Sequence, residues 1–143
     1  MGTRSLTTFI EIYEDENGKK RKNEIVTMYR QYDGYPSGHG EELAEFLSKG
    51  KLVNGIGLGD DLVFNGMGCL SAQVVAHFKN GAGGIYLQRA NKNSWENYRY
   101  HVIGDYNSKN IKLVVYEVNR IARKIFEGTP QEFLTKVKSG VLS

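Results

Sequence analysis

Cysteine, proline and long apolar runs are scarce in this chain of 143 residues, and each scarcity excludes a class of protein. The single cysteine, Cys69, excludes an intramolecular disulfide framework and a metal cluster built from cysteines. The three histidines lie far apart in the sequence, and no two of them have the spacing of metal ligands. We therefore expect neither a bound metal nor a cofactor.

No apolar run approaches the roughly 20 residues that a membrane-spanning helix needs. The N-terminal segment lacks the apolar core of a signal peptide, and Leu6 stands where N-myristoylation would need serine or threonine. These features predict a soluble, cytosolic protein that does not bind membranes. With 40% hydrophobic and 24% charged residues, the chain is expected to fold as one globular domain over residues 1–143.

The net charge of +3 is small, and its sign alone identifies no partner. Domains that bind nucleic acids without sequence preference are usually more basic than this one. The basic cluster at 19–22 follows an acidic cluster at 14–16 across Asn17-Gly18, and a solvated hairpin tip accounts for both.

Apolar periodicity predicts the order of the elements, with a hairpin turn at Asn17-Gly18 and a capping box from Thr129 to Glu132. The expected strands cover 5–14, 24–32, 85–89, 98–103, 111–118 and 121–126, and the expected helices cover 41–49, 69–79 and 130–138. The order is roughly ββααββββα. It indicates an α+β fold, with a mainly antiparallel sheet of about five to six strands and two or three helices.

Segment 29–40, Tyr-Arg-Gln-Tyr-Asp-Gly-Tyr-Pro-Ser-Gly-His-Gly, combines aromatic rings, a cation, a carboxylate and a histidine with three glycines. This composition is typical of a binding loop. Arg30 is expected to pair with an anionic group, and Tyr32 or Tyr35 to stack on a planar one. In the structural alternative, Tyr29 belongs to the core and Asp33-Gly34 is only a turn.

The end of this segment precedes a predicted helix, where backbone amides carry partial positive charge and attract anions. The amides of residues 38–40 are therefore expected to hold phosphate, although Ser37 or His39 could instead serve as the helix cap. The complete set of predicted ligand-binding residues is Arg30, Tyr32, Asp33, Tyr35, Ser37, Gly38, His39 and Gly40.

Two further patterns are candidates for metal binding or catalysis. The glycine-rich connection 54–68 contains Gly-x-Gly-x-Gly, which matches neither the Walker pattern nor the dinucleotide fingerprint, and the following Asp60-Asp61 suits either a divalent cation or solvent. His39 and His101 are candidate catalytic bases, with Asp33 as an orienting group or a metal ligand.

Met-Gly-Thr-Arg-Ser at the N-terminus, together with segment 29–40, resembles a family of small uncharacterised proteins from bacteriophages and other large DNA viruses. The Gly84-Ile85-Tyr86-Leu87 strand and the Tyr98-x-Tyr100 strand extend the likeness over most of the chain. The resemblance implies a viral origin and expression in the host cytoplasm. It implies no activity and no catalytic residue.

Three functions remain open at this stage. The leading hypothesis is a phage-type binding protein with a pocket for an anionic, nucleotide-like ligand, which would sequester a host defence signal. The first alternative is a small hydrolase that cleaves a phosphoester or glycosidic bond of a nucleotide with His39 or His101. The second is an inhibitor of a host protein that acts through a tyrosine-rich surface. Association into a homo-oligomer is compatible with each.

Overall fold

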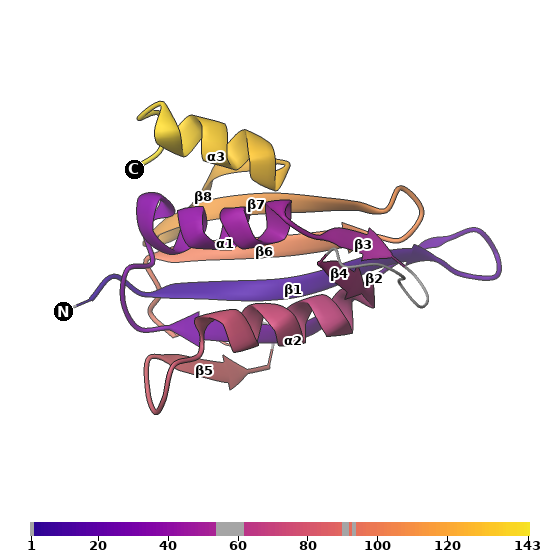
Figure 1. Ribbon diagram of the computed structural model, residues 1–143, viewed down its shortest axis with the longest axis horizontal. Coiled ribbons are helices and arrows are strands. Elements are labelled where there is room, and N and C mark those ends of the chain that lie inside the picture. Colours follow the sequence, from indigo (N-terminus) through magenta and orange to yellow (C-terminus); the bar gives the residue numbers. More distant parts are fainter. Residues whose placement is uncertain (1, 54–61, 90–91, 93) are drawn as a thin grey trace.

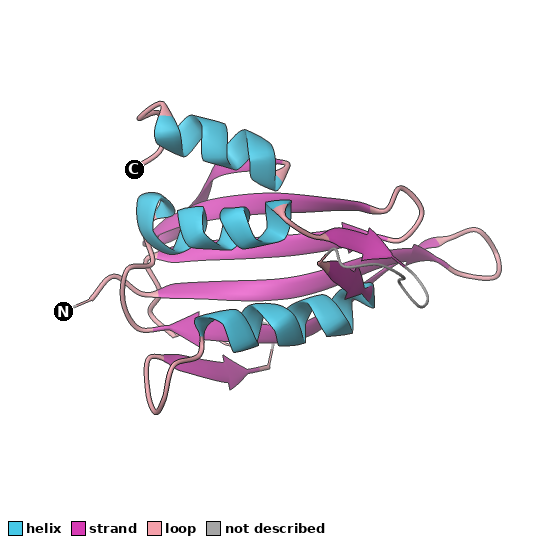
Figure 2. Ribbon diagram, in the orientation of Figure 1, coloured by secondary structure: helices cyan, strands magenta, loops and turns pink. Residues whose placement is uncertain are grey.

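A computed structural model describes residues 2–53, 62–89, 92 and 94–143, and it shows three helices packed against a curled sheet (Figures 1 and 2). In the order in which they pair, the strands of the six-stranded sheet are β5 (Ile85–Gln88), β2 (Lys20–Arg30), β1 (Ser5–Glu14), β6 (Tyr98–Asp105), β7 (Asn110–Asn119) and β8 (Ile121–Gly128). The predicted α+β class is confirmed. The sheet is mixed, because β1 and β6 run parallel while the other four pairs are antiparallel.

All three helices cover the same face of the sheet (Figure 1). They are α1 (Glu41–Ser48), α2 (Gly66–Phe78) and α3 (Pro130–Lys138). The capping box that begins α3 is present, with the Thr129 hydroxyl accepting from the amide of Glu132 and the Glu132 carboxylate accepting from the amide of Thr129. The three predicted helices are therefore confirmed, and α2 begins three residues earlier than expected.

Two short strands and a π-helical turn were not predicted. The strands β3 (Lys51–Val53) and β4 (Val63–Asn65) form a separate parallel pair, and the π-helical turn η1 (Pro36–Gly40) leads directly into α1. A strand of three residues is too short to show an alternating pattern, which explains why the sequence does not reveal this pair.

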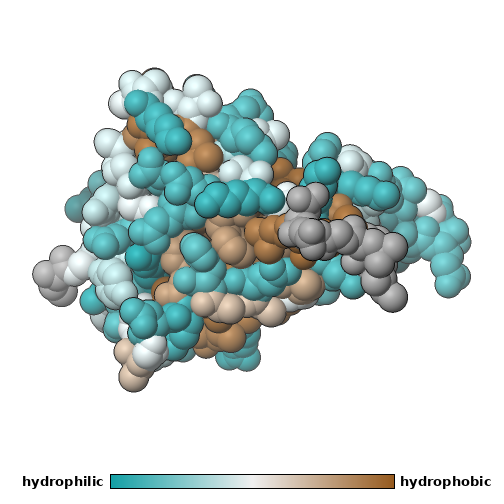
Figure 3. Space-filling view, viewed as in Figure 1, coloured by the Kyte–Doolittle hydropathy of each residue, from teal (hydrophilic) through white to brown (hydrophobic). Residues whose placement is uncertain are grey.

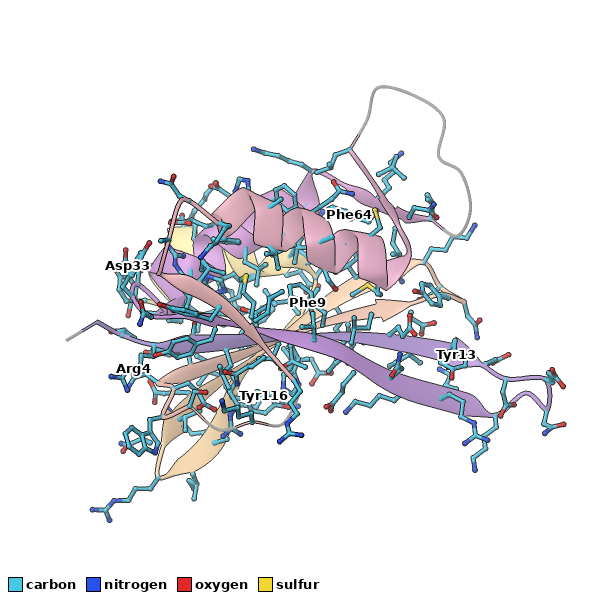
Figure 4. All side chains as sticks on the ribbon, turned by 90° about the horizontal axis from the view of Figure 1, so that it is seen from below. Arg4, Phe9, Tyr13, Asp33, Phe64 and Tyr116 are labelled. Carbon is cyan, nitrogen blue, oxygen red and sulfur yellow. The ribbon has the colours of Figure 1, made fainter. Side chains whose placement is uncertain are left out.

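The core lies between the sheet and the helices, and strand alternation decides which side chains enter it. Tyr100 and Val102 of β6 and Leu113 and Val115 of β7 point toward the helices and are buried, as is Phe9 of β1. Figure 4 shows Phe9 between the sheet and α2, with Tyr116 on the opposite side of the sheet. The predicted shared face of Tyr98, Tyr100 and Val102 agrees with this arrangement.

The turn between β1 and β2 is wider than the predicted two-residue turn. Residues 15–19 connect the strands, and Gly18 adopts φ = +77°. The carboxylate of Asp15 accepts from the amides of Asn17 and Lys19, so the side chain closes a longer loop. The strand β2 also begins earlier and ends earlier than expected, which leaves Tyr32 outside it.

Among the residues that the structure describes, no helix has both the length and the apolar character needed to cross a membrane.

Candidate functional site

Arg30, the last residue of β2, points into the helix layer rather than into solvent. Its side chain is only 9% exposed, and Nη1 lies 3.3 Å from Oε2 of Glu42 and 3.2 Å from Nδ1 of His39. The rings of Tyr32 and Phe78 flank the guanidinium, each with its centroid 5.2 Å from Cζ. The cation expected to meet a ligand is therefore largely enclosed by the protein.

His39 lies entirely inside the protein, between the rings of Phe78 and Tyr100. Burial, and then the neighbouring charge of Arg30, lower the pKa of His39 to about 3, so the imidazole is neutral at pH 7. Because Arg30 donates to Nδ1, the proton of the neutral ring is on Nε2, which donates to Oγ1 of Thr7 at 2.7 Å. Both ring nitrogens are occupied.

The amides of residues 38–40 already donate within the loop. Gly38 and Gly40 donate to the carbonyl of Tyr35, at 2.9 and 3.4 Å, and His39 donates to the carbonyl of Asp33 at 2.7 Å. These three donors face protein acceptors instead of a phosphate.

The alternative in which Ser37 or His39 caps the helix is wrong, because η1 continues directly into α1 and neither boundary has a side-chain cap. The hydroxyl of Ser37 donates instead to the backbone carbonyl of Ser143 at 2.9 Å, and His39 faces Thr7 and Arg30. The turn thus joins the loop to the C-terminal end of the chain.

Close packing explains two glycines of the segment. A Cβ added at Gly40 would lie 2.7 Å from the ring of Phe133 and 3.1 Å from the ring of Tyr100. One added at Gly34 would lie 2.8 Å from the backbone of Arg4, and the carbonyl of Gly34 accepts from the Tyr100 hydroxyl at 2.7 Å. Segment 29–40 therefore connects β2 and β1 with β6, α1 and α3.

The remaining predicted residues lie at the surface around this buried group. Tyr32 is 47% exposed and Tyr35 is 37% exposed. Asp33 is exposed with φ = +56°, and its carboxylate accepts from the Tyr35 hydroxyl. The structure thus separates the predicted site into an enclosed pair, Arg30 and His39, and an exposed rim.

His101 does not join His39. It lies on β6 on the face of the sheet opposite the helices, where its ring packs 5.2 Å from that of Tyr116. Burial lowers the pKa of His101, with a further contribution from Lys22. The two imidazoles are thus on opposite faces of the sheet, and they do not form an acid–base pair.

An apolar groove of about 480 Å³ lies between α2 and the edge of the sheet formed by β2 and β5. Its walls include Ile25, Val26, Ala72, Val75, Ala76 and Leu87. Figure 3 shows apolar residues in brown and tan over α2, on the face turned to the viewer. Sequence reasoning missed this groove. The available signal was that the outward face of α2 carries Ala72 and Ala76, so that the helix is apolar on both sides.

The groove runs beside an open strand edge. The strand β5 pairs only with residues 27–30 of β2. Between residues 20 and 26, β2 pairs with β1 on one side, and no described residue pairs with its other side. The main-chain groups on that side lie next to the Ile25 and Val26 walls of the groove.

Within the described ranges, no three or more histidine, cysteine, aspartate or glutamate side chains are grouped to hold a metal ion. The Asp60-Asp61 pair and residues 54–61 of the glycine-rich connection lie outside the described residues.

Comparisons with protein-family models, with curated proteins and with solved structures find no match to this chain. The resemblance to viral proteins therefore stays a prediction.

Proposed function

We propose that this protein is a binding module that holds an extended segment of another polypeptide along the open edge of β2. The observation that carries the proposal is the position of an apolar groove directly beside unpaired strand backbone. An added strand would hydrogen-bond to that backbone, which is the established mode of β-strand addition.

Strand geometry fits the groove to such a segment. Successive side chains of a strand point to opposite faces of a sheet. Every second side chain of the added strand would therefore enter the groove between β2 and α2, where Val26, Val75 and Ala76 provide apolar contact. The intervening side chains would lie on the opposite face of the sheet, in solvent.

The charges at this edge favour an acidic partner. Lys20, Arg21 and Lys22 are exposed on β2, beyond the groove, and Lys79 lines its other end. Arg21 and Lys22 already form exposed salt bridges with Asp15 and Glu24, which an acidic partner would share. Lys79 is held in place, because its Nζ donates to the carbonyls of Gly83 and Ile85. A second copy of the chain would bring a second row of cations to the same edge, so this surface disfavours self-association.

Exposed side chains along the same edge suit a protein partner. Tyr86 and Leu87 of β5 are 48% and 58% exposed, and Tyr32 lies beside them with its hydroxyl close to Gly84. Tyrosine is enriched among the residues that dominate binding energy. This agrees with the hypothesis of an inhibitor that acts through a tyrosine-rich surface, and the viral resemblance favours a host protein as its target.

The hydrolase alternative has less support, because His39 is enclosed and neutral and His101 lies on the other face of the sheet. An anionic, nucleotide-like ligand has one specific observation in its favour, since Nε of Arg30 is buried and has no hydrogen-bond partner among the described residues.

Selection from a displayed library of random peptides tests the proposed function. Enriched peptides are expected to alternate apolar with acidic or polar residues. Replacing the exposed Ala76 by glutamate places a charge in the groove, so A76E should weaken binding of an enriched peptide at least tenfold, as measured by calorimetry.

The matched control is Q131E, which adds the same charge at an exposed position of α3, away from the groove. It should bind the peptide like the wild type. Enrichment of peptides without alternation, or equal binding by A76E and the wild type, would contradict the proposal.

A further inference from the structure

Two buried side-chain atoms among the described residues have no hydrogen-bond partner, and they belong to neighbouring residues. They are Nε of Arg30 and Oγ of Ser5. Ser5 and Arg30 are paired across β1 and β2, so both side chains start from the helix-facing side of the sheet, with Cβ atoms about 5 Å apart. Buried polar atoms are nearly always satisfied, and a guanidinium nitrogen can only donate, so Nε of Arg30 calls for an acceptor.

The charge of Arg30 is also weakly balanced. Among the described residues only Glu42 forms a salt bridge with it, at 3.3 Å, and the Glu42 side chain is 51% exposed. His39 accepts a hydrogen bond from Nη1 but carries no charge at neutral pH. An enclosed guanidinium with one half-exposed carboxylate can accommodate a better-placed anion.

The geometry of the donors selects the class of anion. Both polar contacts of the guanidinium are made by Nη1. Nε and a neighbouring Nη form one of the pairs of N–H groups through which a guanidinium contacts two oxygens of a carboxylate or phosphate. Tyr32, half exposed beside the guanidinium, offers the face of its ring to a planar group.

We propose that Arg30 binds an oxyanion, carboxylate or phosphate, that is attached to a planar group, and that this oxyanion competes with Glu42 for the charge of the guanidinium. Tyr32 would turn aside to admit the oxyanion to Nε and would then stack on the planar group. The site is separate from the groove proposed above. Arg30 and Tyr32 belong to the set of ligand-binding residues predicted from the sequence. In this site the guanidinium, and not the backbone amides of residues 38–40, binds the oxyanion.

Binding of adenosine monophosphate, compared with adenosine and with inorganic phosphate, tests this inference by calorimetry and by phosphorus NMR. The monophosphate is expected to bind more tightly than either fragment. In E42Q the competing carboxylate is removed from an exposed position without a change of shape, so affinity for the monophosphate should rise about two- to fivefold.

R30K keeps the charge but cannot form the bidentate contact, so its affinity should fall about tenfold. Thermal unfolding establishes whether R30K folds, and E42Q keeps the test decisive if it does not. The groove variant A76E should bind the monophosphate normally, which separates this site from the polypeptide groove. Equal affinity for adenosine and its monophosphate, no binding by wild type and E42Q, or unchanged affinity in E42Q would overturn the inference.

Discussion

Acidification from pH 7 to pH 5 is expected to lower the free energy of unfolding by about 2 kcal/mol through His39 alone. Burial and the charge of Arg30 hold the pKa of His39 near 3 in the fold, against 6.5 in the unfolded chain. Below pH 6.5 the unfolded chain therefore binds a proton that the native state does not. Stability then falls with pH by about 1.4 kcal/mol per unit, until the native pKa is reached.

Urea denaturation at a series of pH values measures this slope, and H39Q provides the comparison. Glutamine retains a donor and an acceptor at this position but does not titrate, so the variant should lose most of the pH dependence between pH 7 and pH 5. H101Q is the matched control, because it removes a histidine whose pKa burial also lowers, on the other face of the sheet. Equal slopes for wild type and H39Q would show that His39 titrates freely.

Replacing Phe133 by alanine is expected to lower the free energy of unfolding by about 3–5 kcal/mol. Phe133 is fully buried in α3, where its ring meets Phe126 edge to face at 5.1 Å and covers Gly40. The substitution removes a buried contact between α3 and segment 29–40. Chemical denaturation followed by fluorescence or circular dichroism measures the loss, which is a large part of the stability of a domain this size.

Substitution of Gly40 tests the contact between Gly40 and Phe133 a second time. G40A would press a methyl group against the ring of Phe133, and we expect it to cost about 1–3 kcal/mol. In the F133A background the two closest contacts of the methyl group are absent and the ring of Tyr100 stays near it, so the cost should shrink. G68A, at a helical position where an added Cβ meets nothing within 4 Å, should instead stabilise the fold by about 0.5–1 kcal/mol. Additive costs for G40A and F133A would contradict this packing.

The elements predicted correctly are those that short sequence patterns determine. The capping box and the proline at the first helical position give the bounds of α3 to the residue, and strand alternation gives the buried face of β6. The parallel pairing of β1 with β6 could not be predicted, because it joins segments about 90 residues apart and leaves no local pattern.

The functional residues show a different limit. Arg30 and His39 have the composition of a binding loop, and composition alone does not distinguish an exposed site from a buried polar network. Alternation along a strand places Tyr29 and Arg30 on opposite faces of the sheet, and only the structure shows that Arg30 is on the helix side. The groove forms because β5 pairs with only part of β2 beside α2. This arrangement involves three separate segments, so no single segment of the sequence predicts it.

Amide hydrogen exchange with a peptide enriched in the library selection is the most direct test of the polypeptide-binding proposal. Bound peptide should slow exchange in residues 20–26 of β2 and leave the outer edge of β8 unchanged, since β8 is the other edge strand of the same sheet. Slower exchange at β8 or within 29–40, with none in 20–26, would show that the open edge beside α2 is not where this protein holds its partner.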